Sequence, residues 1–198
     1  MSKATHKTRL REQLQAARRR VADDVRAAEA RLLSDHLELV VSTGSTVCAY
    51  VPVGAEPGSI EMLDVLLRRA GRVLLPVARA SADDAALPLR WGEYRSDGLV
   101  QGRWGLLEPD EPWLPESALA EASVVLVPAL AVDRRGVRLG RGGGFYDRSL
   151  AGRDRQARLI AMVRDEELVD ELPSEPHDVR MTHVITPKRG VLALPRGE

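Results

Sequence analysis

Apolar positions in the first 80 residues change between the spacing of helices and that of strands. Between residues 3 and 20 they recur every three or four positions, which predicts a helix with a narrow apolar stripe. A second helix is expected at residues 22–41, because acidic residues open it and a Ser-Thr-Gly sequence follows it. Residues 46–51 and 72–77 are apolar runs typical of buried strands, and an amphipathic helix is expected between them at residues 60–70. A strand, a helix and a strand in this order predict two parallel strands joined by a right-handed crossover.

The rest of the chain is interrupted more often by glycine and proline. Residues 79–88 are expected to form a loop and residues 89–94 an edge strand. Residues 95–116 hold three glycines and three prolines, which predicts a long irregular segment of the kind that usually carries function. Four further elements are expected: a strand at residues 123–127, a short helix at 146–151, and strands at 158–163 and 183–185.

This alternation of strands and helices predicts an α/β fold. We expect one domain over residues 1–198, built as three layers with a mostly parallel open sheet between helices on both faces. Ligands of such sheets bind at the carboxyl ends of the strands. Residues 50–56 and 128–147 follow two of the expected strands, so they are the expected binding region.

Composition narrows the possible partners. The 198 residues contain 29 basic and 29 acidic side chains, and this formal neutrality, without a basic block, gives no support for nucleic-acid binding. No apolar run approaches the ~20 residues of a membrane span, so we expect no membrane partner. The single Cys48 cannot form an internal disulfide, which favours a cytoplasmic location. We expect a monomer, because no dimer helix or heptad repeat is evident.

The stretch most informative about function is RRGVRLGRGGGFYD, residues 134–147. Glycine lets backbone N–H groups crowd a ligand, and arginine adds charge-assisted hydrogen bonds to anions, so the stretch predicts phosphate binding. A P-loop is excluded because its Gly-Lys-Ser/Thr ending is missing. A dinucleotide fingerprint is excluded because Phe145 stands where its last glycine is required. The alternative is a glycine-rich surface turn with solvated arginines.

The same stretch resembles the signature R-x-G-x-R-L-G-x-G-x-G-[FY]-Y-D of the 5-formyltetrahydrofolate cyclo-ligase family. Other segments resemble the family in the same order along the chain: Lys7-x-x-x-Arg11, YVPVGAE at residues 50–56, WGLLEP at 104–109 and LPSEPHD at 172–178. The resemblance implies an ATP- and Mg²⁺-dependent ligase that cyclises 5-formyltetrahydrofolate to 5,10-methenyltetrahydrofolate. ADP and phosphate would be released, through a phosphorylated formyl (iminium-phosphate) intermediate.

The resemblance also implies roles for individual residues. Arg138 and Lys7 would be catalytic. Residue chemistry makes Asp147 the candidate Mg²⁺ ligand, with a helix N-terminal acid as the alternative, and Asp133 is a weaker carboxylate candidate. The reduced folate would bind to Tyr50, Glu56, Trp104 and Tyr146. ATP would bind to Lys7, Arg11, Arg134, Gly136, Arg138, Leu139, Gly140, Arg141, Gly142, Gly143, Gly144, Tyr146 and Asp147.

Residue type alone supports more ordinary interpretations of several of these positions. Lys7 and Arg11 are then solvated helix residues, and Tyr50 is a core aromatic of its strand. Glu56 is expected to be exposed at the end of that strand, because Pro-Gly follows it. His177 and Asp178 are expected to be loop residues.

Two other classes of function remain open from the sequence. One is a phosphosugar isomerase or CoA-transferase-like enzyme, which would use the phosphate loop without ATP. The other is a non-catalytic protein that binds a nucleotide or a folate.

Overall fold

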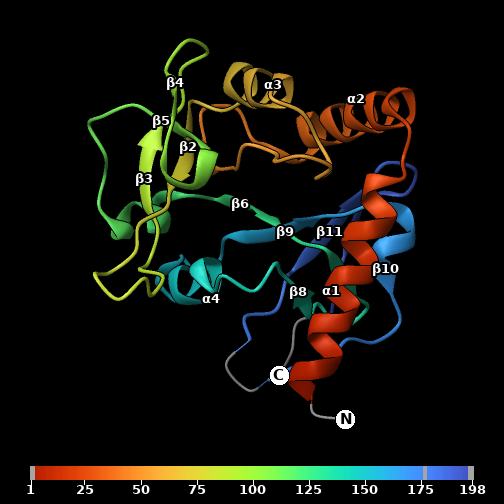
Figure 1. Ribbon diagram of the computed structural model, residues 1–198. Helices are drawn as coiled ribbons and strands as arrows, with labels where there is room; N and C mark the ends of the chain where they lie inside the picture. Colours follow the sequence, from red (N-terminus) through yellow and green to blue (C-terminus); the bar gives the residue numbers. More distant parts are fainter. Residues whose placement is uncertain (1–2, 176–177, 196–198) are drawn as a thin grey trace.

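A seven-stranded sheet forms the centre of the protein in the computed structural model, which describes residues 3–175 and 178–195 (Figure 1). The strand order is β12-β11-β9-β6-β1-β2-β3. The strands are β1 (Thr46–Cys48), β2 (Arg72–Val77), β3 (Arg90–Glu93), β6 (Val124–Pro128), β9 (Arg158–Met162), β11 (His183–Thr186) and β12 (Gly190–Ala193).

The five inner strands are parallel, and only the edge strands β3 and β12 run antiparallel to their neighbours. Cys48 of β1 aligns with Leu74 of β2 on one side and with Val125 of β6 on the other. The inner strands are buried on both faces, as expected of a parallel sheet. The predicted α/β class and the edge position of the strand near residue 90 are confirmed.

Two helices cover one face of the sheet, α2 (Asp23–Val40) and α3 (Glu61–Arg69) (Figure 1). The charges of α3 match the helix dipole. Acidic side chains occupy its first turn, Arg68 and Arg69 occupy its last turn, and the dipole favours both placements. Its Leu63 and Leu66 pack in one cluster with Leu33 and Leu37 of α2 and with the strand residues of that face.

Short helices cover the other face. They are η2 (Glu116–Glu121), α4 (Phe145–Ser149) and η3 (Leu150–Gly152). Leu119 and Leu150 are fully buried against Val125 and Leu159 of the sheet. The predicted helix at residues 146–151 is therefore a single α-turn followed by a 3₁₀ turn.

The α1 helix (Lys3–Arg19) lies beside a small separate sheet, β10-β7-β8 (Figure 1). Leu10 and Leu14 of α1 pack there against Val137 and Leu139. The strands are β7 (Ala131–Asp133), β8 (Arg138–Leu139) and β10 (Leu168–Val169), the last preceded by η4 (Asp165–Glu167).

The prediction of an irregular segment at residues 95–116 is wrong in part. Its centre is an antiparallel hairpin of β4 (Leu99–Gln101) and β5 (Leu107–Pro109), with η1 (Arg103–Gly105) at its tip. Three-residue strands are too short to show a period of two, so the glycines and prolines dominate the pattern. The small sheet is also absent from the prediction for this reason, and the four-residue strand β12 is absent as well.

No helix in the described ranges is long and apolar enough to cross a membrane. Cys48 is a free, buried thiol on β1, and burial raises its pKa above the ordinary thiol value.

Candidate active site

A pocket of about 290 Å³ opens at the carboxyl ends of β1, β2 and β6. From β1 the chain crosses by α3 to β2, whereas from β6 it continues to β9 on the other side, so the strand order reverses between β1 and β6. Such a reversal leaves a crevice between the connections, which is where open α/β sheets bind ligands. Tyr50 and Val51, which follow β1, and Pro128 and Ala129, at the end of β6, line the pocket.

One wall of the pocket is the glycine-rich loop between β8 and α4, residues 140–144. Gly142 has φ +101° and Gly144 has φ +73°, a left-handed backbone that a side chain would strain. A Cβ atom on Gly144 would lie 2.3 Å from a guanidinium nitrogen of Arg148. The loop therefore presents bare backbone to the pocket, as the phosphate-binding interpretation requires.

Arg138 lies at the base of this wall. Its Nη2 donates to Asp147 Oδ1, its Nη1 lies 3.4 Å from the carbonyl oxygen of Pro128, and its guanidinium stands 5.9 Å from the centre of the Tyr146 ring. Among the described residues, neither the buried Arg138 Nε nor the buried Tyr146 hydroxyl has a hydrogen-bond partner. An unsatisfied buried polar group costs about 1–3 kcal/mol, so these two donors fit a site that a polar ligand completes.

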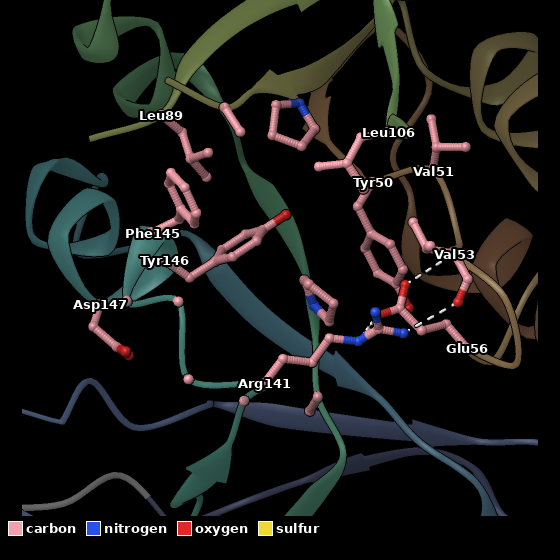
Figure 2. A pocket seen from close by; sticks show the side chains of 18 of the residues that line it. Tyr50, Val51, Val53, Glu56, Leu89, Leu106, Arg141, Phe145, Tyr146 and Asp147 are labelled. Atoms are coloured by element: carbon pink, nitrogen blue, oxygen red, sulfur yellow. Dashed lines mark hydrogen bonds and ion pairs between the residues drawn. The ribbon is translucent and has the colours of Figure 1, made fainter. Parts of the chain in front are cut away.

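The opposite wall carries Tyr50 and Glu56, and Arg141 reaches across to it from the glycine-rich loop (Figure 2). Arg141 Nε lies 3.0 Å from Glu56 Oε1, and Arg141 Nη2 donates to the carbonyl oxygen of Val53 at 3.2 Å. The backbone N–H of Val53 donates to Glu56 Oε2 at 2.9 Å. Glu56 lies in the loop that follows β1, eight residues past the end of the strand, and the expected exposure is wrong, because these contacts fold the side chain inward and leave it 9% exposed.

Two tyrosines bring their rings into the pocket from its two walls, and Tyr50 lies beside Glu56 (Figure 2). Tyr146 lies beside the Arg138 guanidinium. Burial and then the Glu56 carboxylate raise the pKa of both phenols above the ordinary value. Both phenols are therefore neutral at physiological pH. Both rings offer flat apolar surface and no nucleophile. The Tyr50 hydroxyl donates to the carbonyl oxygen of Pro57 at 3.4 Å, whereas the Tyr146 hydroxyl is available as a donor.

Lys7 and Arg11 lie on the face of α1 that approaches the glycine-rich loop. Arg11 Nε donates to the carbonyl oxygen of Gly140 at 2.9 Å, so Arg11 supports the loop from outside the pocket lining. Lys7 Nζ lies 3.3 Å from Glu175 and 3.6 Å from Asp178. Both cations therefore have protein partners, unlike the solvated pair that residue type suggests. His177 lies outside the described residues.

Asp147 is the carboxylate of the glycine-rich wall, half-exposed and paired with Arg138. In the part of the chain that the structure describes, no group of three His, Cys, Asp or Glu side chains converges on a point. Such a site does not fit a metal held by protein alone. It does fit Mg²⁺ bound mainly by phosphate oxygens, which takes one or two carboxylates.

The second carboxylate candidate for a metal, Asp133, is corrected by the structure. It is fully buried, and its oxygens accept N–H bonds from Arg135, Val137 and Leu172 at 2.8, 2.9 and 3.1 Å. These bonds hold the turn between β7 and β8 and the segment after β10. Asp133 therefore has a structural role, away from the pocket lining.

Besides Lys7 and Arg11, three more residues that the resemblance assigns to ATP lie outside the pocket lining. Arg134 is solvent-exposed and pairs with Asp170 at 2.9 Å. Gly136 has φ +83°, and a Cβ there would lie 2.4 Å from the carbonyl oxygen of Met181, which explains its glycine by packing. Leu139 is buried in the cluster under α1. The positions of these three residues favour a structural role for each.

Trp104 stands on the tip of the β4–β5 hairpin, 52% exposed and with φ +60°. Its ring meets Phe145, which lines the pocket, edge to face at 5.7 Å between centroids. Arg103 covers the ring at 4.6 Å. A left-handed backbone is strained for a non-glycine residue, and such strain is concentrated at functional sites. Trp104 lies at the rim of the pocket, outside its lining.

Glu108 lines the pocket, although the sequence assigned it no role. It is buried, and its two oxygens accept bonds from the Ala78 N–H at 2.8 Å and from Arg79 at 2.9 Å. Its place in the WGLLEP segment at residues 104–109 was the available signal. Glu108 joins the β4–β5 hairpin to the end of β2, and so positions this side of the pocket.

Comparison with known proteins gives a consistent result. The model of the 5-formyltetrahydrofolate cyclo-ligase family matches residues 3–187. The 5-formyltetrahydrofolate cyclo-ligase of Mycolicibacterium smegmatis is 58% identical over 188 residues, covering 95% of this chain and 97% of that protein. That of Escherichia coli K12 is 30% identical over 145 residues, covering 73% and 79%. The NMR structure of Aquifex aeolicus 5,10-methenyltetrahydrofolate synthetase has the same fold, with a TM-score of 0.77 at 21% identity over 97% of this chain and 94% of that one.

Proposed function

The chain belongs to the 5-formyltetrahydrofolate cyclo-ligase family, and we propose that its pocket closes 5-formyltetrahydrofolate to 5,10-methenyltetrahydrofolate with ATP. The observation that carries the site assignment is the pairing of two unlike walls in one pocket. A glycine-rich loop with arginines faces an acid and an aromatic ring. One wall suits phosphates and the other a flat heterocycle with N–H groups.

The glycine-rich wall is the proposed nucleotide site. The backbone of residues 140–144 approaches the phosphates, and Arg138 and Arg141 neutralise their charge. Arg138 Nε, which has no partner among the described residues, is the donor expected to bind a phosphate oxygen. Lys7 lies one helical turn from Arg11, and its three donors can exchange Glu175 and Asp178 for the terminal phosphate.

The opposite wall is the proposed folate site. Glu56 accepts N–H bonds from the edge of the reduced pterin ring, and Tyr50 supplies flat apolar contact. Tyr146 reaches the folate from the other side, and its hydroxyl is available as a donor. Trp104 at the rim is placed to cover the part of the folate that leaves the pocket.

The chemistry needs alignment and charge neutralisation. The formyl oxygen attacks the terminal phosphorus, and the bond to the leaving ADP breaks. N10 of the folate then attacks the formyl carbon, the carbon–oxygen bond breaks, and phosphate leaves with that oxygen while N10 loses its proton. Placing the nucleotide and the folate on facing walls supplies the proximity that this sequence requires, and the arginines stabilise the charge on the transferred group.

Mg²⁺, when bound with the nucleotide, neutralises phosphate charge. We propose Asp147 as its protein ligand. Asp147 would then exchange its bond with Arg138 for the ion, which also leaves Arg138 free to bind phosphate.

The test mixes purified protein with 5-formyltetrahydrofolate and MgATP and follows the near-ultraviolet band of the methenyl product together with ADP. We expect the band to grow with one ADP released per product, and to stay absent without ATP. Growth without ATP, or ADP release without product, would contradict the proposal. Binding of both compounds without any product would favour a non-catalytic binder.

A further inference from the structure

Arg141 and Glu56 join the two walls of the pocket. The Nε–Oε1 distance is 3.0 Å, and Arg141 Nη2 also donates to the Val53 carbonyl oxygen at 3.2 Å. The other oxygen of Glu56 accepts the Val53 N–H at 2.9 Å. Each carboxylate oxygen therefore already has one partner, and Arg141 holds Oε1 (Figure 2).

The two partners differ in how easily they can move. Glu56 is 9% exposed and fixed to its own loop by the Val53 N–H. Arg141 is 49% exposed and sits between Gly140 and Gly142, the latter with φ +101°. A half-exposed arginine on a glycine-rich backbone can change its direction at low cost, so the ion pair opens by movement of Arg141.

Arg141 belongs to the wall that binds phosphate in the proposed function, and Glu56 belongs to the wall that binds the pterin. We propose that Arg141 is a positioning residue that couples the two substrates, occupying Glu56 until nucleotide phosphates draw it away. This inference rests on the proposed function. Nucleotide binding then leaves Glu56 with a free oxygen that faces the folate half of the pocket.

The exchange is favourable on both sides. A phosphate offers the arginine fork several oxygens and more charge than one carboxylate. A nearly buried carboxylate that loses its partner is costly, and pterin N–H groups remove that cost by donating to it. A folate that arrives first must instead compete with Arg141 for the same oxygen.

Linkage makes this coupling measurable. If nucleotide raises folate affinity by a factor, folate must raise nucleotide affinity by the same factor. For one ion pair exchanged between two ligands we expect a factor on the order of ten, within the usual range of coupling between sites.

The experiment measures the dissociation constant of 5-formyltetrahydrofolate by titration calorimetry, with and without a saturating, non-hydrolysable ATP analogue and Mg²⁺. Four proteins are compared: wild type, Arg141→Met, Arg141→Lys and Arg135→Ala. Methionine keeps the apolar stem without the charge. Arg135 is the matched control, because it is 50% exposed and pairs with the acidic Glu171 at 2.8 Å, outside the pocket lining.

We expect the analogue to tighten folate binding on the order of tenfold in wild type and in Arg135→Ala. In Arg141→Met the ratio falls to near one, and folate alone binds at least as tightly as it does to wild type alone. Arg141→Lys, which keeps the charge without the fork, restores part of the ratio.

Different results separate the two hypotheses. A wild-type ratio near one, or an undiminished ratio in Arg141→Met, overturns the coupling and leaves the proposed function intact. Failure of wild type to bind the folate under any condition overturns both.

Discussion

Arg18 and Glu167 form a buried ion pair in which both side chains are 3% exposed. Arg18 Nε and Nη2 each lie 2.7 Å from a different oxygen of Glu167, and Nη2 also donates to the carbonyl oxygen of Ala129 at 2.6 Å. Ala129 lines the pocket, so this pair connects α1 and the segment before β10 to the pocket floor.

We predict that Arg18→Met destabilises the protein by about 3–5 kcal/mol, because it leaves the Glu167 carboxylate buried without its cation. The double variant Arg18→Met/Glu167→Met should recover most of this loss, since neither charge then remains. Urea unfolding of the three proteins measures both effects. Equal stability of the single and double variants would contradict this account.

The sequence predicted the sheet well, and the reason is visible in its strands. Residues 73–75 and 124–127 are buried on both faces, so their side chains are apolar without interruption and the pattern is unambiguous. The β4–β5 hairpin gave no such signal. Its residues are partly exposed and its strands have three residues each. Close packing of Glu108 on Gly102 helps to hold it, and such a contact leaves no periodic pattern in the sequence.

The site was predictable where backbone and charge determine it. The spacing of glycine and arginine predicted a phosphate-binding loop, and the glycine-rich loop and Arg138 do line the pocket. Arg18 was not identifiable, because it is one of three consecutive arginines and only the fold shows which of them is buried. Gly136 shows the opposite case, a motif residue whose glycine serves packing against Met181.

Gly136→Ala is predicted to lower stability by about 2 kcal/mol or more, through left-handed backbone strain and contact with the Met181 carbonyl. Gly152→Ala is the control, because nothing lies within 4 Å of a Cβ there and its φ is not positive. That control should be neutral or slightly stabilising. Thermal unfolding and nucleotide titration are measured together. A Gly136→Ala protein of normal stability with weakened nucleotide binding would instead support the ATP contact.

Stability is predicted to fall at alkaline pH because of Tyr50 and Tyr146. Burial and the Glu56 carboxylate raise the pKa of both phenols, so the folded protein keeps two protons that the unfolded chain releases near pH 10. Their contribution is complete below that pH and is lost as pH rises, by about 1.4 kcal/mol per pH unit for each tyrosine. Urea unfolding at increasing pH checks this slope. Tyr146→Phe should reduce it by one proton, and an unchanged slope would contradict burial of that phenol.

Trp104→Ala is predicted to weaken folate binding with little effect on stability, because the side chain is half exposed and packs mainly on Phe145 and Arg103. Aromatic stacking of this kind contributes roughly 1 kcal/mol, so KM for the folate should rise about fivefold or more while kcat changes less. Trp113→Phe is a control that keeps an aromatic ring under Arg79. A large loss of thermal stability in Trp104→Ala would instead assign the ring to packing.

Substitutions of Arg138 and of Asp147 are predicted to affect activity differently, although the two residues form one ion pair. Arg138→Ala should lower kcat about 100- to 1000-fold, as expected when a donor to developing charge is removed. Asp147→Asn keeps the shape and a hydrogen-bond acceptor for Arg138 but weakens metal ligation. If Asp147 holds Mg²⁺, the Mg²⁺ concentration for half-maximal activity rises in Asp147→Asn, and saturating Mg²⁺ restores most of the rate. If Asp147 only orients Arg138, activity in Asp147→Asn falls equally at every Mg²⁺ concentration, which would remove Asp147 from the metal site.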